Sequence, residues 1–190
     1  VAIGAGENDG NGSNSGHVRI YQNNGSSWSQ IGNDIDGETA DDYSGHSVSL
    51  SSDGNTVAIG ASSNDGNGSN AGHVRIYNYN GTSWNQIGTD IDGEAGGDNS
   101  GWSVSLSSDG STVAIGSILN DANGSDAGHV RIYGNVAGTW TQIGIDIDGE
   151  AAVDYSGHSV SLSSDGQTVA IGALSNDGNG TDAGHVRIFS

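Results

Sequence analysis

Apolar and polar residues alternate over short stretches of this chain, with a period of two residues. In residues 57–60 (Val-Ala-Ile-Gly) the two large apolar side chains fall on one face, and in residues 103–106 (Ser-Val-Ser-Leu) every second residue is apolar. A period of two is typical of a β-strand, because successive side chains of a strand point to opposite faces. No stretch has the 3.6-residue apolar stripe of a helix. The pattern therefore predicts an all-β protein.

The predicted strands recur as a unit. The motif Gly-His-Val-Arg-Ile begins at Gly16, Gly72, Gly128 and Gly184, each 56 residues after the last. Each unit predicts four strands: Val-Ala-Ile-Gly, His-Val-Arg-Ile-Tyr, a strand from Trp to Ile at about residues 84–91, and Ser-Val-Ser-Leu. Turn sequences such as Asn-Gly and Ser-Asp-Gly separate them. We expect about 14 strands, in units at 1–56, 57–112, 113–168 and a partial unit at 169–190.

A four-stranded antiparallel unit of this length, repeated in tandem, is typical of a β-propeller blade. The coils of a parallel β-helix are much shorter. One face of each Val-Ala-Ile-Gly strand carries almost no side chain, so we expect a neighbouring blade to pack very close to it. With Ser-Val-Ser-Leu as the first strand of a blade, the first blade lacks its first strand and the last blade lacks its fourth. The 190 residues are thus predicted to be part of one repeat array, whose edges further repeats or other chains cover.

The strand and turn sequences resemble a known repeat. Residues 44–50 (Ser-Gly-His-Ser-Val-Ser-Leu), the turn at 52–54 (Ser-Asp-Gly) and residues 57–61 (Val-Ala-Ile-Gly-Ala) resemble the FG-GAP repeat, the blade motif of integrin-α-like β-propellers. The resemblance covers every unit and is closest to the variant in bacterial surface and secreted proteins. It implies a propeller fold and an extracellular or cell-surface location.

This chain departs from the FG-GAP pattern in two respects. Ser-Gly stands where the family has Phe-Gly, and Gly-Ala-Ser, Gly-Ser-Ile and Gly-Ala-Leu stand where the family has Gly-Ala-Pro. Family members that bind calcium carry Asp-x-Asp-x-Asp-Gly before the Val-Ala-Ile strand, whereas residues 50–54 (Leu-Ser-Ser-Asp-Gly) hold a single carboxylate. We therefore expect no calcium site at the family's usual place.

Charge narrows the classes of partner. The chain has 23 acidic residues and four basic ones, which gives a formal net charge of −19. Such a surface repels nucleic acid and anionic lipid and attracts cations. No run of 18 apolar residues is present, so we expect no membrane insertion. With no cysteine, disulfides do not hold the fold.

A repeated acidic loop is the candidate metal site. Its carboxylates stand at relative positions 1, 3, 5 and 9 of a glycine-containing loop, a spacing similar to that by which a chain wraps oxygen ligands around Ca²⁺. Alternatively, the first two carboxylates lie on a strand and the whole set is a solvated or arginine-paired acidic edge. Both interpretations stay open. The residues are Asp34, Asp36, Glu38, Asp42, Asp90, Asp92, Glu94, Asp98, Asp146, Asp148, Glu150 and Asp154.

Histidine, arginine and tryptophan also recur with the repeat. Each Gly-His-Val-Arg-Ile motif places an arginine two residues after its histidine, and we expect the arginine to pair with acids of its own or the next blade and the histidine to be structural. Trp28, Trp84 and Trp140 are predicted to be buried strand anchors, or alternatively a sugar-binding surface. A second histidine series is interrupted by Trp102, a replacement that a packing position tolerates and a metal site does not.

No non-repeated cluster of catalytic residue types stands out, and the nucleophile motif Gly-x-Ser-x-Gly is absent, so we predict no enzyme and no catalytic residues. The sequence instead favours an extracellular structural or adhesive repeat protein, a scaffold or filament-forming surface component that associates with itself or with neighbouring repeat units. The alternative is a propeller module that binds a glycan or a surface protein, assisted by calcium.

Overall fold

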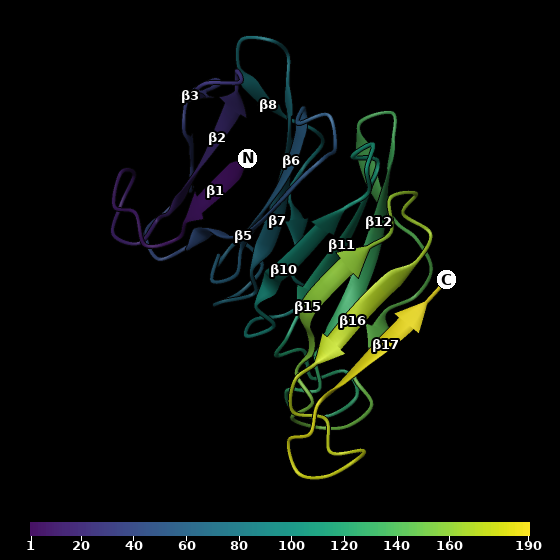
Figure 1. Cartoon of the computed structure of the whole chain (residues 1–190). Coiled ribbons are helices and arrows are strands. Elements are labelled where there is room, and N and C mark those ends of the chain that lie inside the picture. Colours follow the sequence, from purple (N-terminus) through teal and green to yellow (C-terminus); the bar gives the residue numbers. More distant parts are fainter.

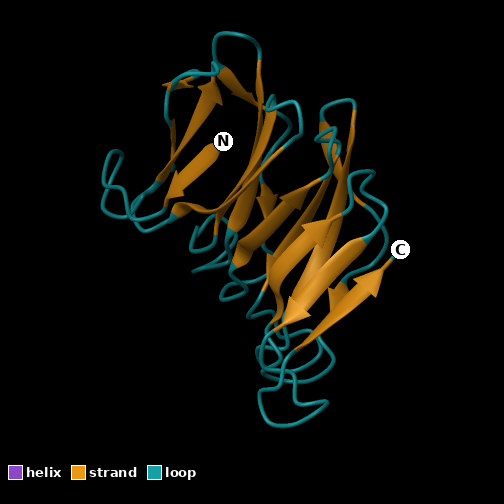
Figure 2. Ribbon diagram, in the orientation of Figure 1, coloured by secondary structure: helices purple, strands orange, loops and turns teal.

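The computed structural model describes all 190 residues and consists of strands and loops. Four antiparallel sheets stand side by side, and the chain passes from one to the next without returning (Figures 1 and 2). We call them blades 1 to 4 in chain order. The N-terminus lies in blade 1 and the C-terminus in blade 4, at opposite ends of the row (Figure 1). No helix long and apolar enough to cross a membrane is found.

Blades 2 and 3 are complete. In each, four strands follow one another in space as they do in sequence, and a short fifth segment pairs with the third strand. Blade 2 contains β5 (Ser44–Leu50), β6 (Thr56–Ala61), β7 (His73–Tyr79), β8 (Trp84–Gln86) and β9 (Ile91–Asp92). Blade 3 contains β10 (Ser100–Leu106), β11 (Thr112–Ser117), β12 (His129–Val136), β13 (Thr139–Gln142) and β14 (Ile147–Asp148).

Blades 1 and 4 are each one strand short, at opposite edges. Blade 1 lacks the first strand, and blade 4 ends after the third. This is the arrangement that the position of Ser-Val-Ser-Leu in the repeat predicted. Blade 1 contains β1 (Ala2–Ala5), β2 (His17–Asn23), β3 (Trp28–Gln30) and β4 (Ile35–Asp36), and blade 4 contains β15 (Ser156–Leu162), β16 (Val169–Ala173) and β17 (His185–Phe189).

The outer strand differs from the prediction. Instead of one strand over about residues 84–91, blade 2 has β8 and β9, which pair with the same strand, β7, on either side of an interruption. The register shifts by two residues between the Tyr77–Gln86 and Val74–Ile91 pairs, and Gly88 between them has a φ of 74°. A glycine with positive φ allows such a bulge. The same interruption in three blades gives 17 strands where about 14 were expected.

The hydrophobic core lies between blades, not within them. Val74, Ile76 and Ile91 of blade 2 form one buried cluster with Val113 and Ile115 of blade 3. Corresponding residues form the clusters between blades 1 and 2 and between blades 3 and 4. We call the face that a blade turns to the next blade its front face, and the opposite one its rear face. Because each sheet is apolar on both faces, a single blade has no core of its own.

Glycine allows the blades to approach closely. A Cβ atom added at Gly60 of blade 2 would collide with the carbonyl oxygen of Gly101 in blade 3, and one added at Gly116 would collide with that of Gly157 in blade 4. The face of the Val-Ala-Ile-Gly strand that carries almost no side chain therefore packs against the first strand of the next blade, as the sequence predicted. The Ser47 and Ser103 hydroxyls donate to the same two carbonyl oxygens at 2.7 Å.

Candidate functional sites at the blade interfaces

Each arginine of blades 2, 3 and 4 reaches back to the preceding blade. The buried Arg131 of blade 3 donates from Nη2 to the backbone oxygen of Asp92 at 2.7 Å, and its Nη1 lies 3.7 Å from Glu94 Oε1. Arg75 makes the same two contacts with Asp36 and Glu38. The expected pairing of arginine with acids is present, but the acids belong to the preceding blade and not to the arginine's own or next blade. A hydrogen bond to a backbone carbonyl, which the sequence did not indicate, accompanies it.

Tryptophan forms a second repeated link. The indole Nε1 of Trp84 donates to the carbonyl oxygen of Ile31 in blade 1, and that of Trp140 donates to Ile87 in blade 2, both at 3.0 Å. These two side chains are half-buried against the interblade clusters. Trp28 has no preceding blade and is 57% exposed. The prediction of buried strand anchors is therefore wrong for Trp28, because burial at this position comes from the neighbouring blade.

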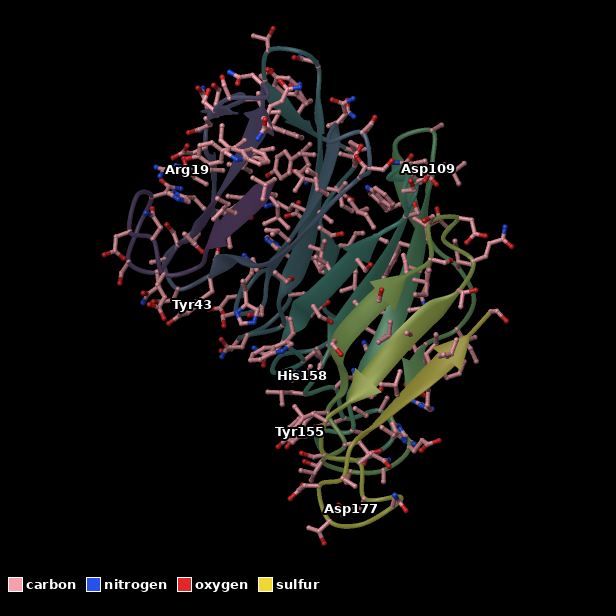
Figure 3. The ribbon with its side chains drawn as sticks, viewed as in Figure 1. Arg19, Tyr43, Asp109, Tyr155, His158 and Asp177 are labelled. Carbon is pink, nitrogen blue, oxygen red and sulfur yellow. The ribbon has the colours of Figure 1, made fainter.

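The rear face of blade 1 shows what happens without a preceding blade. Arg19 is exposed there and turns to Asp34 of its own blade, with Nε 3.0 Å and Nη2 2.8 Å from the carboxylate (Figure 3). This guanidinium, together with the Gln30 amide, lowers the pKa of Asp34 to about 2. The arginine position thus pairs within its blade when the neighbouring blade is absent.

Both outer faces of the row expose apolar side chains. Val186 and Ile188 on the front of blade 4 are 66% and 70% exposed, and Val1 and Ile3 on the rear of blade 1 are also exposed. A cavity of about 480 Å³ opens between blades 3 and 4, where blade 4 has no outer strand, and is lined by residues that include Ile143 and Phe189. At the preceding interface the residue equivalent to Ile143, Ile87, packs with Trp140 in the interblade cluster.

The twelve acidic residues proposed as calcium ligands do not gather into one site per loop. The last acid of each loop is buried and caps it: Asp42 accepts from the Thr39 backbone N and Oγ1 at 2.9 and 2.8 Å. Asp98 accepts from the backbone N of Ala95 and from Asn120 Nδ2, and Asp154 does the same with Ala151 and Asn176.

The remaining acidic residues make contacts with different blades. The backbone oxygens of Asp36, Asp92 and Asp148 accept a hydrogen bond from the arginine of the following blade. Glu94 and Glu150 lie beside both the arginine and the histidine of the following blade, and Glu38 pairs with Arg75. Asp34, Asp90 and Asp146 lie beside the histidine of their own blade.

Acids and histidines consequently meet in groups of three that could hold a metal ion. Within each group, one ligand atom per residue lies within 4.8 Å of the others. The sequence did not reveal these groups, because two of them draw residues from different blades. They are Glu38, His73 and Asp90 between blades 1 and 2; Glu94, His129 and Asp146 between blades 2 and 3; and His17, Asp34 and Asp36 within blade 1.

Burial perturbs the histidines at the first two interfaces. His73 and His129 are fully buried, and burial lowers the pKa of each, with a smaller contribution from the adjacent arginine. Neither ring nitrogen of His129 has a hydrogen-bond partner. A buried polar group left unpaired costs about 1–3 kcal/mol, and Arg131 Nε and Ser100 Oγ at the same interface are also buried without a partner.

The second histidine series is a packing feature. The ring centroids of His46 and Trp102 on successive blades lie 4.4 Å apart, and those of Trp102 and His158 lie 6.1 Å apart. Burial beside Trp102 lowers the pKa of His46. Tryptophan and histidine both pack at this position with their rings tilted against the rings of the adjacent blades.

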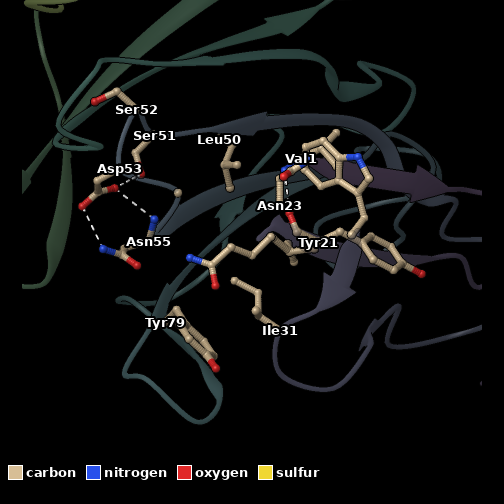
Figure 4. Close-up of a pocket in the computed structure, with 14 residues that line it drawn as sticks. Val1, Tyr21, Asn23, Ile31, Leu50, Ser51, Ser52, Asp53, Asn55 and Tyr79 are labelled. Carbon is tan, nitrogen blue, oxygen red and sulfur yellow. Dashed lines mark hydrogen bonds between the residues drawn. The ribbon is translucent and has the colours of Figure 1, made fainter. Parts of the chain in front are cut away.

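A polar and aromatic pocket lies at the edge of blades 1 and 2. Its volume is about 340 Å³, and Tyr21, Trp28 and Tyr79 contribute aromatic side chains to it (Figure 4). Asp53 on the opposite wall accepts from the Ser51 hydroxyl at 2.7 Å and is tied to Asn55 (Figure 4). The sugar-binding alternative for the tryptophans applies to this pocket through Trp28.

Comparison with known proteins identifies the repeat. Residues 34–77 and 89–133 match the FG-GAP repeat, and these segments recur along the chain at the 56-residue period. Two segments of the chain thus match the FG-GAP repeat, as the resemblance in the sequence predicted. FG-GAP repeats are typical of extracellular proteins. No curated protein matches the chain.

Two solved structures share the fold. One is a protein from Bacteroides uniformis named as a 6-phosphogluconolactonase, with a TM-score of 0.57 and 13% identity over 85% of this chain and 42% of that one. The other is the periplasmic gluconolactonase PpgL of Pseudomonas aeruginosa, with a TM-score of 0.51 and 18% identity over 84% of this chain and 44% of that one. The chain therefore spans less than half the length of these structures. At such identities the likeness shows the fold alone, a propeller-like row of blades.

Proposed function

We propose that this chain is a non-enzymatic structural module of an extracellular or cell-surface protein, which assembles by stacking its two open blade faces on further blades of the same kind. The observation that carries the proposal is that these faces bear the side chains that pack together at every interior interface. Val186 and Ile188 on the open front face are the counterparts of Val74 and Ile76, which are fully buried by blade 3. The partner is a second copy of the chain, or the next repeats of a longer one.

The rear face of blade 1 is the complement of that front face. Val1 and Ile3 occupy the positions of Val57 and Ile59, which bury the front face of blade 1 in the same structure. A front face joined to a rear face is a head-to-tail contact. Such contacts generate rings if the rotation closes and filaments if it does not. The module is thus suited to a scaffold or filament. Its two open blade faces are also suited to adhesion.

The contact between two copies is expected to be weaker than an interior interface. Blade 1 lacks its inner strand and blade 4 its outer strand, so only the two middle strands of each would overlap. The net charge of −19 adds repulsion that salt screens. We therefore expect association to depend on concentration and to strengthen with ionic strength.

Light scattering at rising protein and salt concentration, followed by negative-stain electron microscopy, tests the proposal. We expect the mass to rise beyond that of one chain and linear or ring-shaped particles to appear. Ile188→Glu places a charge on the front face and should keep the chain monomeric. Ile145→Glu is the matched control, because Ile145 is 88% exposed and its counterparts are the polar residues Asn33 and Thr89. A monomer at every concentration, or equal association of both variants, would contradict the proposal.

Glycan binding is the second candidate, and the aromatic pocket between blades 1 and 2 supports it. Aromatic faces with amide and carboxylate groups beside them suit the apolar and hydroxyl-bearing surfaces of a sugar. Trp28→Ala should then abolish retention on immobilised glycans, whereas Trp140→Ala should not. The structural role is preferred because Trp28 is open only through the absence of a preceding blade.

A further inference from the structure

The unpaired His129 faces two carboxylates across the interface of blades 2 and 3. Its side chain is 0% exposed, and its Nδ1 lies 3.9 Å from both Glu94 Oε2 and Asp146 Oδ2. Neither of its nitrogens has a hydrogen-bond partner. A nitrogen donor that no protein group satisfies, directed between two carboxylate oxygens, is the arrangement that a bound cation would complete.

We propose that Glu94, His129 and Asp146 bind a divalent transition-metal ion such as Zn²⁺, which links blade 2 to blade 3. Imidazole and carboxylate together suit zinc and its neighbours in the first transition row, whereas calcium takes oxygen ligands only. Zinc holds nitrogen and oxygen ligands at about 2.0–2.2 Å, so the ligand atoms, which lie within 4.8 Å of one another, must move closer together. Glu94 can supply this movement, because its side chain is 43% exposed.

Neighbouring groups position the ligands. Gln142 Nε2 donates to Asp146 Oδ1 at 2.6 Å, which leaves Oδ2 directed at His129. Such outer hydrogen bonds orient metal ligands and commonly change affinity by about 10–100-fold. Solvent-exposed Glu94 provides the route by which an ion enters.

Arg131 is the competing cation at this interface. Its Nη1 lies 3.7 Å from Glu94 Oε1, which is longer than the 3.2 Å between Arg75 and Glu38 at the preceding interface. Arg131 keeps its hydrogen bond to the Asp92 carbonyl and its position over the Tyr133 ring when Glu94 turns to a metal. Glu94 is thus the less tightly held of the two glutamates, and its interface is the one to which we assign the ion.

The last interface provides a matched control. Glu150 stands beside His185 and Arg187 as Glu94 stands beside His129 and Arg131. Glu150 and His185 do not belong to any group of three ligand residues in this structure, unlike Glu94 and His129. Glu150→Gln therefore makes the same change in charge at an equivalent place without touching a complete site.

Calorimetric titration with Zn²⁺, and visible absorption of the protein titrated with Co²⁺, test the proposal on the wild type, Glu94→Gln, Asp146→Asn and Glu150→Gln. We expect Glu94→Gln and Asp146→Asn to lose one equivalent of bound metal, or at least about tenfold in affinity, and Glu150→Gln to match the wild type. Zn²⁺ at 100 times its dissociation constant should raise Tm by about 5–10 °C.

Failure of the wild type to bind Zn²⁺ or Co²⁺, equal behaviour of Glu94→Gln and Glu150→Gln, or an equal response to Ca²⁺ would overturn the proposal. These outcomes are independent of self-association.

Discussion

The interior interface and the open faces are made of the same residues in different surroundings. Arg131 inside the row is buried and binds the preceding blade, whereas Arg19 at the rear edge is exposed and binds Asp34 of its own blade. Ile76 is buried and Ile188, at the same repeat position, is exposed. The repeat therefore fixes what each side chain can do, and the neighbouring blade decides which of these contacts it makes. In a stacked architecture most of the stability lies in such interfaces.

The largest expected difference between the two regions concerns apolar burial. Ile76→Ala leaves a cavity between blades 2 and 3 and should lower the free energy of unfolding by about 2–5 kcal/mol. Ile188→Ala removes the same atoms from an exposed site and should change it by less than about 0.5 kcal/mol. Urea unfolding at dilute protein concentration measures both. Similar losses in the two variants would mean that the front face of blade 4 is already covered in solution.

The next largest expected difference is in the cost of replacing a glycine by alanine at an interior interface and at the open face of blade 4. Gly116→Ala places a Cβ against the backbone of Gly157 and should destabilise the chain by about 1–3 kcal/mol, because one blade must move away from the next. Gly172 has the same position in blade 4, where its added Cβ would meet only the Ser159 side chain. We expect Gly172→Ala to cost less than about 1 kcal/mol. Thermal unfolding of the pair checks the comparison, and a costlier Gly172→Ala would refute it.

The smallest expected difference is between the pKa values of the aspartates in the Ser-Asp-Gly turns of blades 3 and 4. In blade 3, hydrogen bonds from the Ser107 hydroxyl and from the backbone and hydroxyl of Ser111 lower the pKa of Asp109 to about 2. In blade 4, Gln167 replaces that serine, and Asp165 keeps only the Ser163 and backbone bonds, which also lower its pKa. NMR titration should show Asp109 ionising at the lower pH, and Ser111→Gln should shift it towards Asp165.

The sign of the accompanying change in stability follows from the lowered pKa. A carboxyl group whose folded pKa lies below its unfolded value favours the folded state above the unfolded pKa of about 3.8, and the contribution disappears as the pH falls through about 2. The effect is small because the turn is open to solvent. An Asp109 that titrates at the ordinary value would show that these hydrogen bonds do not form in solution.

Much of the fold was determined by local sequence. Alternation in Val-Ala-Ile-Gly and Ser-Val-Ser-Leu and the Gly-containing turns define the strands, because side chains of a strand alternate between faces whatever its neighbours are. The 56-residue period defines the blades, and its phase predicted which strand each terminal blade lacks. The one local error, an unbroken outer strand, arose because glycine is compatible with both an extended strand and a bulge.

The candidate sites were decided by tertiary structure. Sequence spacing placed four acids in one loop, but Glu94 leaves that loop to meet His129, 35 residues further on, and Asp98 turns inward to cap it. The recurrence of Glu, His and Asp in each repeat was visible in the sequence. Which of these residues come into contact depends on how far one blade is shifted relative to the next. A periodic sequence does not specify that shift. Contacts across a blade interface are set by packing, so only the stacked structure shows that a buried histidine of one blade faces a carboxylate of another.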